Sequence, residues 1–261
     1  MAMSTELQQR REGGVLTLTI DRPADANRLS PALLGELTSL VEALREDAAT
    51  NVVVLTGAGA LFSMGILNPA IRASMSKHDV VQLVRRANAL FDALEALPQV
   101  VIGALNGTAG AGGVELALAC DLRYAAASAS MVMPEATWGG FPGAGAPVRL
   151  PMVVGKARAL ELIATGREID AQEMLRLGIV LDVFSAEQFM DRVRAIATRI
   201  SESGPLAVRG AKRIVAARQE PGFRAARELS DALRHALEWS QDVDEGIAAH
   251  KEGRKPRFSG K

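Results

Sequence analysis

The stretch that decides the fold is NGTAGAGGVELALACD, residues 106–121. It follows the β-branched run 100–102, which predicts a buried strand. Its four glycines between 107 and 113 predict a sharply turning loop that a ligand can approach closely. The apolar run 114–120 predicts a helix whose first N–H groups have no intrahelical partner and whose dipole favours negative charge. The stretch therefore predicts an oxyanion site, with Glu115 about one helical turn away.

The composition is typical of one large globular domain or a domain with an appendage. The 261 residues are 48% hydrophobic and 23% charged, and the formal net charge is +0. No basic run alternates with aromatic residues, which argues against a nucleic-acid partner. The uncharged stretch 100–114, which contains Asn and several glycines, is shorter than the roughly 18 residues of a membrane span, and residues 1–14 hold no apolar signal region. We therefore expect a soluble cytoplasmic protein without a membrane partner.

Few residues are suited to binding a metal. Cys120 is the only cysteine, so no disulfide within the chain and no cysteine metal cluster is expected. His78, His235 and His250 lack the spacing of metal ligands. We expect no metal site.

Strand and helix patterns alternate as far as residue 184. Alternating or β-branched runs predict strands at 15–20, 52–56, 100–105, 121–125, 130–133 and 179–183. Apolar periodicity and caps predict helices at 31–44, 79–97, 114–120, 156–164 and 170–177. Residues 61–69 are predicted to form an apolar loop, and 139–145 a loop rich in turn formers. Beyond residue 186 only helices are predicted, at about 186–202, 205–218, 222–239 and 242–251.

Three features are candidates for one site. They are the N–H groups at Gly112 and Gly113, the glycine loop at Gly65, and the glutamates Glu115 and Glu135, 20 residues apart. Converging N–H groups can hold an oxygen that gains negative charge, and two carboxylates can divide acid and base work. Each feature also has a structural explanation. The glycine loop is equally typical of a core-packing turn, and Glu135 of an ordinary loop carboxylate. Glu115 lies in an apolar helix, and a buried carboxylate needs a partner or a purpose.

The chain resembles the crotonase superfamily, the enoyl-CoA hydratases and isomerases, from about residue 14 to residue 261. The motifs that carry the resemblance are Asp21-Arg22-Pro23 with Asn27, Phe62-Ser63-Met64-Gly65, Asn106-Gly107 through Gly112-Gly113-Val114-Glu115, Cys120-Asp121-Leu122-Arg123, Pro134-Glu135, Phe141-Pro142-Gly143-Ala144-Gly145, Thr165-Gly166-Arg167 and Asp244-Glu245-Gly246. They are highly specific for the fold and less specific for the reaction, because the family hosts many reactions.

The resemblance implies an α/β fold, a crotonase-like spiral of β-β-α turns with a C-terminal helical trimerisation region. We expect residues 1–200 to form the spiral core with the CoA-ester site, and residues 201–261 to form the helical region. The family's assembly is a homotrimer, often paired into a hexamer. The implied partner is an acyl-CoA thioester, and no cofactor is implied beyond the coenzyme A of the substrate itself.

The resemblance also assigns site residues. The backbone N–H groups of Ile66 and Gly112 would form the oxyanion hole, and Glu115 and Glu135 would be catalytic, as in the hydratase branch. The implied substrate-binding residues are Met64, Gly65, Leu67, Gly113, Trp138 and Gly143. The candidates for contacting CoA phosphates are Lys251, Arg254 and Lys255, either in this chain or from a neighbouring subunit.

The chain departs from the family pattern beside this site. The usual Ala-Gly-Ala-Asp reads Met64-Gly65-Ile66-Leu67, Ala111 replaces a glycine, and Ala146-Pro147 replaces Gly-Thr. We expect an enoyl-CoA hydratase that adds water to a 2-enoyl-CoA and gives a 3-hydroxyacyl-CoA. The alternatives are a Δ3–Δ2 enoyl-CoA isomerase, a specialised acyl-CoA dehydratase, and a non-catalytic acyl-CoA-binding protein, for which the altered loop is the motivation.

Overall fold

The strands of the protein form two sheets. The computed structural model describes residues 6–219, 227–228, 231–232, 235–236 and 238–257. The larger sheet has the order β1–β2–β3–β5–β7–β10, and the smaller has the order β4–β6–β8–β9. The bounds of the larger sheet are β1 Leu7–Glu12, β2 Val15–Ile20, β3 Val52–Gly57, β5 Val100–Leu105, β7 Leu122–Ala126 and β10 Val183–Phe184. Those of the smaller are β4 Leu61–Ser63, β6 Thr108–Gly110, β8 Ser130–Val132 and β9 Ile169–Asp170.

The chain passes between the two sheets in successive turns. β3 leads into β4, β5 into β6, and β7 into β8, so each turn adds one parallel strand to each sheet. Helices follow the strand pairs: α2 (Pro69–Ala73) and α3 (Lys77–Glu95) after β4, and α4 (Gly112–Leu118) after β6. Only β1 with β2 and β8 with β9 pair antiparallel among the described strands. This is a spiral of β-β-α turns.

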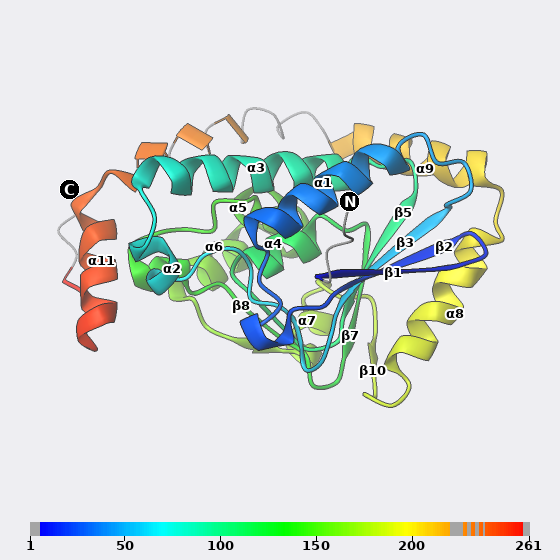
Figure 1. Ribbon diagram of the computed structural model, residues 1–261. Coiled ribbons are helices and arrows are strands. Elements are labelled where there is room, and N and C mark those ends of the chain that lie inside the picture. The colour runs from blue at the N-terminus through cyan, green and yellow to red at the C-terminus, as the bar shows by residue number, and fades with distance from the viewer. Residues whose placement is uncertain (1–5, 220–226, 229–230, 233–234, 237, 258–261) are drawn as a thin grey trace.

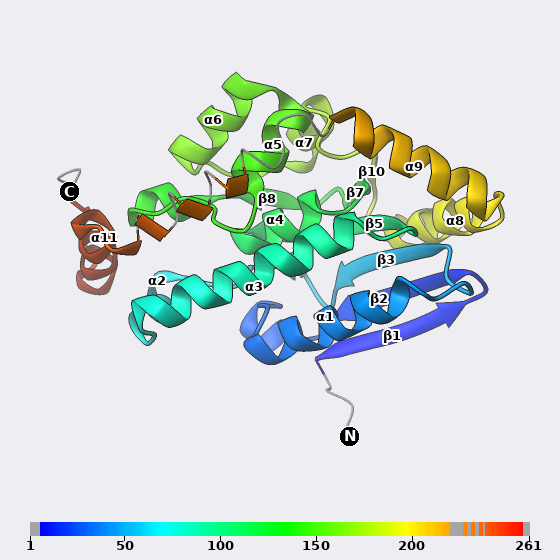
Figure 2. The ribbon, with the colours of Figure 1, turned by 90° about the horizontal axis from the view of Figure 1, so that it is seen from above.

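Helices cover both faces of the larger sheet (Figures 1 and 2). α1 (Pro31–Leu44) and α3 pack on one face with α4 and α5 (Ala146–Val154), and α8 (Phe189–Ser201) packs on the other. β3 and β5 are buried along their whole length, which explains their β-branched sequences. The remaining helices are α6 (Lys156–Thr165), α7 (Ala171–Arg176), α9 (Pro205–Gln219) and α11 (Gln241–Glu252), with the 3₁₀ helices η1 (Pro23–Asp25) and η2 (Pro134–Trp138).

Most predicted elements form within a few residues of their expected bounds. One prediction is wrong in extent: the strand expected at 179–183 forms only at Val183–Phe184. The amides of Ile179 and Val180 donate to the carbonyl of Met174 in α7, and the Ile179 carbonyl accepts from the Arg123 side chain at 2.7 Å. The start of the segment therefore closes the turn after α7, and hydrogen bonds to β7 begin only at Leu181. The helix expected at 222–239 lies largely outside the described residues, and the division at residue 200 stays a prediction.

The sequence analysis missed several short elements, and the segment 61–69, expected to be a loop, in fact begins with β4 and ends at the first residue of α2. The short strands β6 and β9 were also missed, because two or three residues are too few to show a periodic pattern. Two longer elements were missed as well, because their patterns are weak. β1 buries only Leu7 and exposes the rest, so it lacks the alternation of a half-buried strand. α5 contains Pro147 and Pro151, and proline inside a segment normally argues against a helix, so the sequence did not predict one. Among the described residues, no helix is both long and apolar enough to cross a membrane.

The short helix α4 is held at its C-terminal end by the half-buried Arg123. The Arg123 guanidinium donates to the carbonyl of Ala117, in the last turn, and to that of Cys120, just after the helix. Cys120 itself is buried, and desolvation raises the pKa of its thiol to about 12. The C-terminal helix α11 lies beside α2, at the end of the molecule opposite to α8 and α9 (Figures 1 and 2).

Candidate active site

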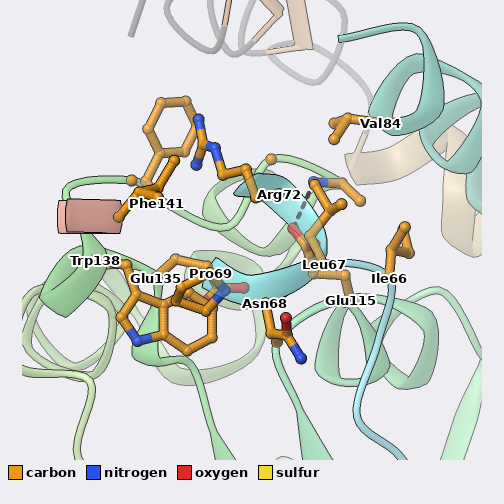
Figure 3. A pocket seen from close by; sticks show the side chains of 16 residues that line it. Ile66, Leu67, Asn68, Pro69, Arg72, Val84, Glu115, Glu135, Trp138 and Phe141 are labelled. Carbon is orange, nitrogen blue, oxygen red and sulfur yellow. Dashed lines mark hydrogen bonds between the residues drawn. The ribbon is translucent and has the colours of Figure 1, made fainter. Parts of the chain in front are cut away.

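A pocket opens where the start of α4 meets α2, α3, η2 and α11 (Figure 3). It holds about 580 Å³, counted to its open mouth. Its walls are mostly apolar, with a few polar groups, which is usual for small-molecule sites. The lining residues are Ile66, Leu67, Asn68, Pro69, Arg72, Val84, Ala111, Gly112, Glu115, Glu135, Trp138, Gly140, Phe141, Gly143, Ala144 and Ile247.

The glycine loop after β4 touches the first residue of α4. Gly65 has φ +72, and a Cβ on it would lie 2.4 Å from the amide nitrogen of Gly112. Conversely, a Cβ on Gly112 would lie 3.2 Å from the amide nitrogen of Ile66. The loop is fixed from behind, since the amide of Leu29 donates to the Gly65 carbonyl at 2.9 Å and Arg28 donates to the Met64 carbonyl at 2.7 Å. Two segments far apart in sequence thus meet at the pocket.

The amides of Ile66 and Gly112 are available to a ligand. Both residues line the pocket, and among the hydrogen bonds of the described residues neither amide donates one. Buried N–H groups are rarely left unsatisfied, so donors kept at a cavity wall indicate a place for an acceptor. The structure therefore brings the two predicted oxyanion-hole residues together.

Glu115 is buried and held by the backbone of one loop. Its Oε1 accepts from the amide of Ala144 at 2.7 Å and from the amide of Ala146 at 3.1 Å. Burial raises the pKa of this carboxyl to about 7, although the backbone hydrogen bonds and the nearby Arg149 lower it. No hydrogen bond to Oε2 is found among the described residues, and Glu115 lines the pocket. The carboxylate thus has one anchored oxygen and one that can serve a ligand or water.

Glu135 reaches the same pocket from a different element. It lies in η2, after Pro134, and is half-buried. Its backbone carbonyl accepts from the amide of Gly140 at 2.9 Å, which closes the turn that follows. Figure 3 shows Glu115 and Glu135 among the side chains that line the pocket, coming from α4 and η2. The structure therefore brings the two predicted carboxylates together.

The predicted substrate-binding residues divide into two groups. Leu67, Trp138 and Gly143 line the pocket. Met64, Gly65 and Gly113 do not: a Cβ on Gly110 would lie 2.5 Å from the Met64 methyl, and one on Gly113 would lie 2.0 Å from the Ser63 carbonyl. These three residues belong to the contact that sets the pocket's shape.

The predicted CoA-phosphate candidates lie at or after the end of α11. Lys251 and Lys255 are exposed. Arg254 is held by its own chain, with Nη1 and Nη2 at 2.6 and 2.9 Å from the carboxylate oxygens of Glu245 and a further bond to Glu252. Ile247 of the same helix lines the pocket.

Several lining residues were missed by the sequence analysis. Arg72, at the end of α2, forms an ion pair with the buried Glu238 and contributes to the pocket wall. Phe141 and Ile247 come from a loop and from a helix far along the chain. Asn68 offered a signal, because Asn followed by Pro marks a helix start and its side chain caps α2.

Comparisons with known proteins find relatives over nearly the whole chain. Residues 10–261 match the enoyl-CoA hydratase/isomerase family. The 2,3-dehydroadipyl-CoA hydratase of Escherichia coli K12 is 34% identical over 98% of this chain and 100% of its own length. The putative enoyl-CoA hydratase/isomerase YngF of Bacillus subtilis is 35% identical over 93% and 94%. A crystal structure of enoyl-CoA hydratase from Bacillus anthracis superposes with a TM-score of 0.81 at 37% identity, over 98% of this chain and 100% of that one.

Proposed function

The chain belongs to the enoyl-CoA hydratase/isomerase family and has the crotonase fold, and from that premise we propose that it adds water to a 2-enoyl-CoA and yields a 3-hydroxyacyl-CoA. The single observation that carries this proposal is the convergence of four groups on one pocket. Glu115 and Glu135 line it together with Ile66 and Gly112, whose amides have no other acceptor among the described residues.

The two amides would hold the thioester oxygen. Addition of water at C3 moves the electrons of the double bond through C2 onto that oxygen, so an enolate forms. Donors that are already in place when this charge develops stabilise the transition state more than the substrate. Both donors are backbone N–H groups, one on the loop at Gly65 and one at the start of α4, so neither depends on the identity of a side chain. The N–H group of residue 66 is therefore present with Ile66 as it would be with a smaller residue.

The two glutamates would divide the proton work. Glu115, through its unanchored Oε2, takes a proton from the attacking water, whose oxygen bonds to C3. Glu135 gives a proton to C2 as the enolate collapses, and transfer of a proton from Glu115 to Glu135 through solvent completes the cycle. A base whose pKa of about 7 lies near neutral pH suits this role. The addition changes no net oxidation state, so the proposed reaction calls for no redox cofactor.

We propose that the chain works as a homotrimer or as a hexamer of two trimers. α9 exposes the large apolar side chains of Leu206, Ile214 and Val215, which is the kind of surface that a partner covers. We favour Lys251 and Lys255 as the residues that bind the CoA phosphates, because Arg254 already forms ion pairs with Glu245 and Glu252. Light scattering measures the mass, and replacement of each lysine by methionine should raise KM without changing kcat if it binds phosphate.

The test is the ultraviolet absorbance of the conjugated enoyl thioester after mixing with a panel of 2-enoyl-CoA esters. Hydration removes the band, and Glu115→Gln and Glu135→Gln should each slow its loss by about 10²–10⁴-fold. Turnover of a 3-enoyl-CoA that survives Glu115→Gln, with no hydration by the unaltered protein, would assign an isomerase instead. Calorimetric binding of CoA esters without turnover of any enoyl or hydroxyacyl ester would assign a binding protein.

A further inference from the structure

The loop that anchors Glu115 rests on a buried arginine. Arg149, in the first turn of α5, has a side chain that is 3% exposed. Its Nη2 lies 2.5 Å from Oδ1 of Asp92 and its Nε lies 2.9 Å from Oε2 of Glu95, both on α3. A buried guanidinium needs such partners, because desolvating an unpaired charge costs several kcal/mol. The two carboxylates lie on α3, away from the pocket lining.

The Arg149 guanidinium packs directly against Gly145, in the loop that anchors Glu115. A Cβ on Gly145, which has φ +124, would lie 2.1 Å from the Arg149 Nη1. The Arg149 amide also donates to the Gly145 carbonyl at 3.0 Å. On the other side, Asn88 of α3 donates from Nδ2 to the Gly143 carbonyl at 2.9 Å. The segment that presents the amide of Ala144 is therefore held from α3 and from α5.

The charges around Glu115 can be named. Arg149 is the charged side chain whose field lowers the pKa of Glu115. Asp92 and Glu95 offset that positive charge from behind, and Asp92 also pairs with Arg227. Two further charged side chains line the same pocket, those of Glu135 on η2 and Arg72 on α2.

We propose, resting on the hydration proposed above, that Arg149 is a positioning residue that holds the loop 143–146 in place and puts a positive charge behind it. Asp92 and Glu95 hold Arg149 in place and moderate its charge. Arg149 touches neither substrate nor water in this scheme. Arg149 affects the reaction in two ways: it positions the amides that donate to Glu115 Oε1, and its positive charge favours the ionised carboxylate.

Variants that remove charges of opposite sign test this proposal, because they should shift the pKa of Glu115 in opposite directions. Arg149→Met removes the positive charge, and Asp92→Asn with Glu95→Gln removes the charges that offset it. Arg149→Lys keeps the charge but loses the fork that bonds both carboxylates. Arg167→Met is the matched control, because Arg167 also bonds two carboxylates but lies on the surface. The direct readout is the ¹³C shift of the Glu115 carboxyl against pH, assigned by its disappearance in Glu115→Gln. The kinetic readout is the pH profile of kcat/KM.

We expect Arg149→Met to raise the pKa of Glu115 and to move the acid limb of kcat/KM in the same direction, a loss of up to about tenfold below neutral pH that recovers in alkali. The Asp92→Asn/Glu95→Gln protein should move the pKa downward, and Arg149→Lys should recover most of the shift. In the Asp92→Asn/Glu95→Gln protein, both new side chains keep an oxygen that can accept a hydrogen bond from Arg149. This double variant therefore remains informative if Arg149→Met fails to fold.

An unmoved Glu115 titration in folded Arg149→Met, or an upward shift in the double variant, would overturn the proposal. So would an equal loss of rate at every pH, which a merely structural arginine would cause. The titration needs no turnover. The predicted shifts in a protein that hydrates no ester would therefore support the role of Arg149 and reject the hydratase, and normal hydration with unmoved titrations would do the reverse.

Discussion

Replacement of Gly65 by alanine should damage the proposed oxyanion hole more than the fold. Gly65 lies at φ +72, and its Cβ would be 2.4 Å from the Gly112 amide nitrogen and 2.8 Å from its Cα. Ordinary contact begins at 3.4 Å, so the loop and the start of α4 must separate by about 1 Å. Both carry a proposed donor, Ile66 on the loop and Gly112 on the helix.

The expected magnitudes follow from this geometry. An alanine in the left-handed region costs about 1–2 kcal/mol of folding stability. A misplacement of about 1 Å at a reacting centre can cost about 10²-fold in rate. Complete loss of one oxyanion donor costs about 10²–10³-fold, which sets the upper bound. We therefore expect kcat to fall by about 10²-fold, with a smaller change in KM, because the donors act chiefly in the transition state.

The control is Gly59→Ala. Gly59 has φ +70, so it carries the same backbone strain, but its Cβ would lie 3.6 Å from the nearest atom, in the Pro23 side chain. Both variants are compared by thermal melting and by steady-state hydration of one 2-enoyl-CoA. Both variants should lose stability from the backbone strain, and Gly65→Ala should lose more because its Cβ meets backbone atoms. A large loss of kcat is expected in Gly65→Ala alone. Equal kcat values in two folded variants would refute the reasoning that the contact between Gly65 and Gly112 sets the donors.

Three further predictions concern other parts of the molecule. Folding raises the pKa of Glu115 from 4.5 to about 7, so its stabilising contribution is fully present below pH 4.5 and is lost as the pH rises through 7. Glu115→Gln should therefore be more stable than the parent above pH 7, by up to about 3 kcal/mol, and not at pH 4.5, as melting at the two pH values will show. Lys212→Met should lower the free energy of unfolding in urea by about 2 kcal/mol, because the half-buried Asp121 carboxylate, 2.6 Å from Lys212 Nζ, loses its ion-pair partner. Adding Asp121→Asn should restore part of the lost stability. Ile247→Ala should raise KM by about fivefold and leave kcat unchanged, because α11 supplies apolar pocket wall but no reacting group.

The central part of the site could be predicted because its signal is local. Four glycines before an apolar helix indicate exposed amides, and a carboxylate among apolar neighbours indicates a buried acid, so Gly112 and Glu115 were identified from their own surroundings. Glu135 had no such context and gained its role only from the resemblance. The resemblance also supplied Ile66, since a backbone donor leaves no mark in the side chain.

The rest of the site depends on contacts between distant segments. Ile247 lines the pocket although 132 residues separate it from Glu115. Arg149 lies between two prolines in a helix that the sequence did not predict. Its burial follows from the position of α3, whose Asp92 and Glu95 bind it. No local pattern reports such pairings. The same limit applies to β1, which exposes most of its side chains and is recognisable as a strand only from its backbone pairing with β2.

The buried thiol of Cys120 makes the protein a convenient host for site-specific probes. The thiolate is the reactive form, and with a pKa of about 12 only about one thiol in 10⁵ is ionised at pH 7. Because the chain has no other cysteine, a thiol introduced on the surface would be the sole site of alkylation under mild conditions. A fluorophore attached in place of the exposed His250 of α11 would report when a ligand arrives beside that helix, without any need to remove the native cysteine first.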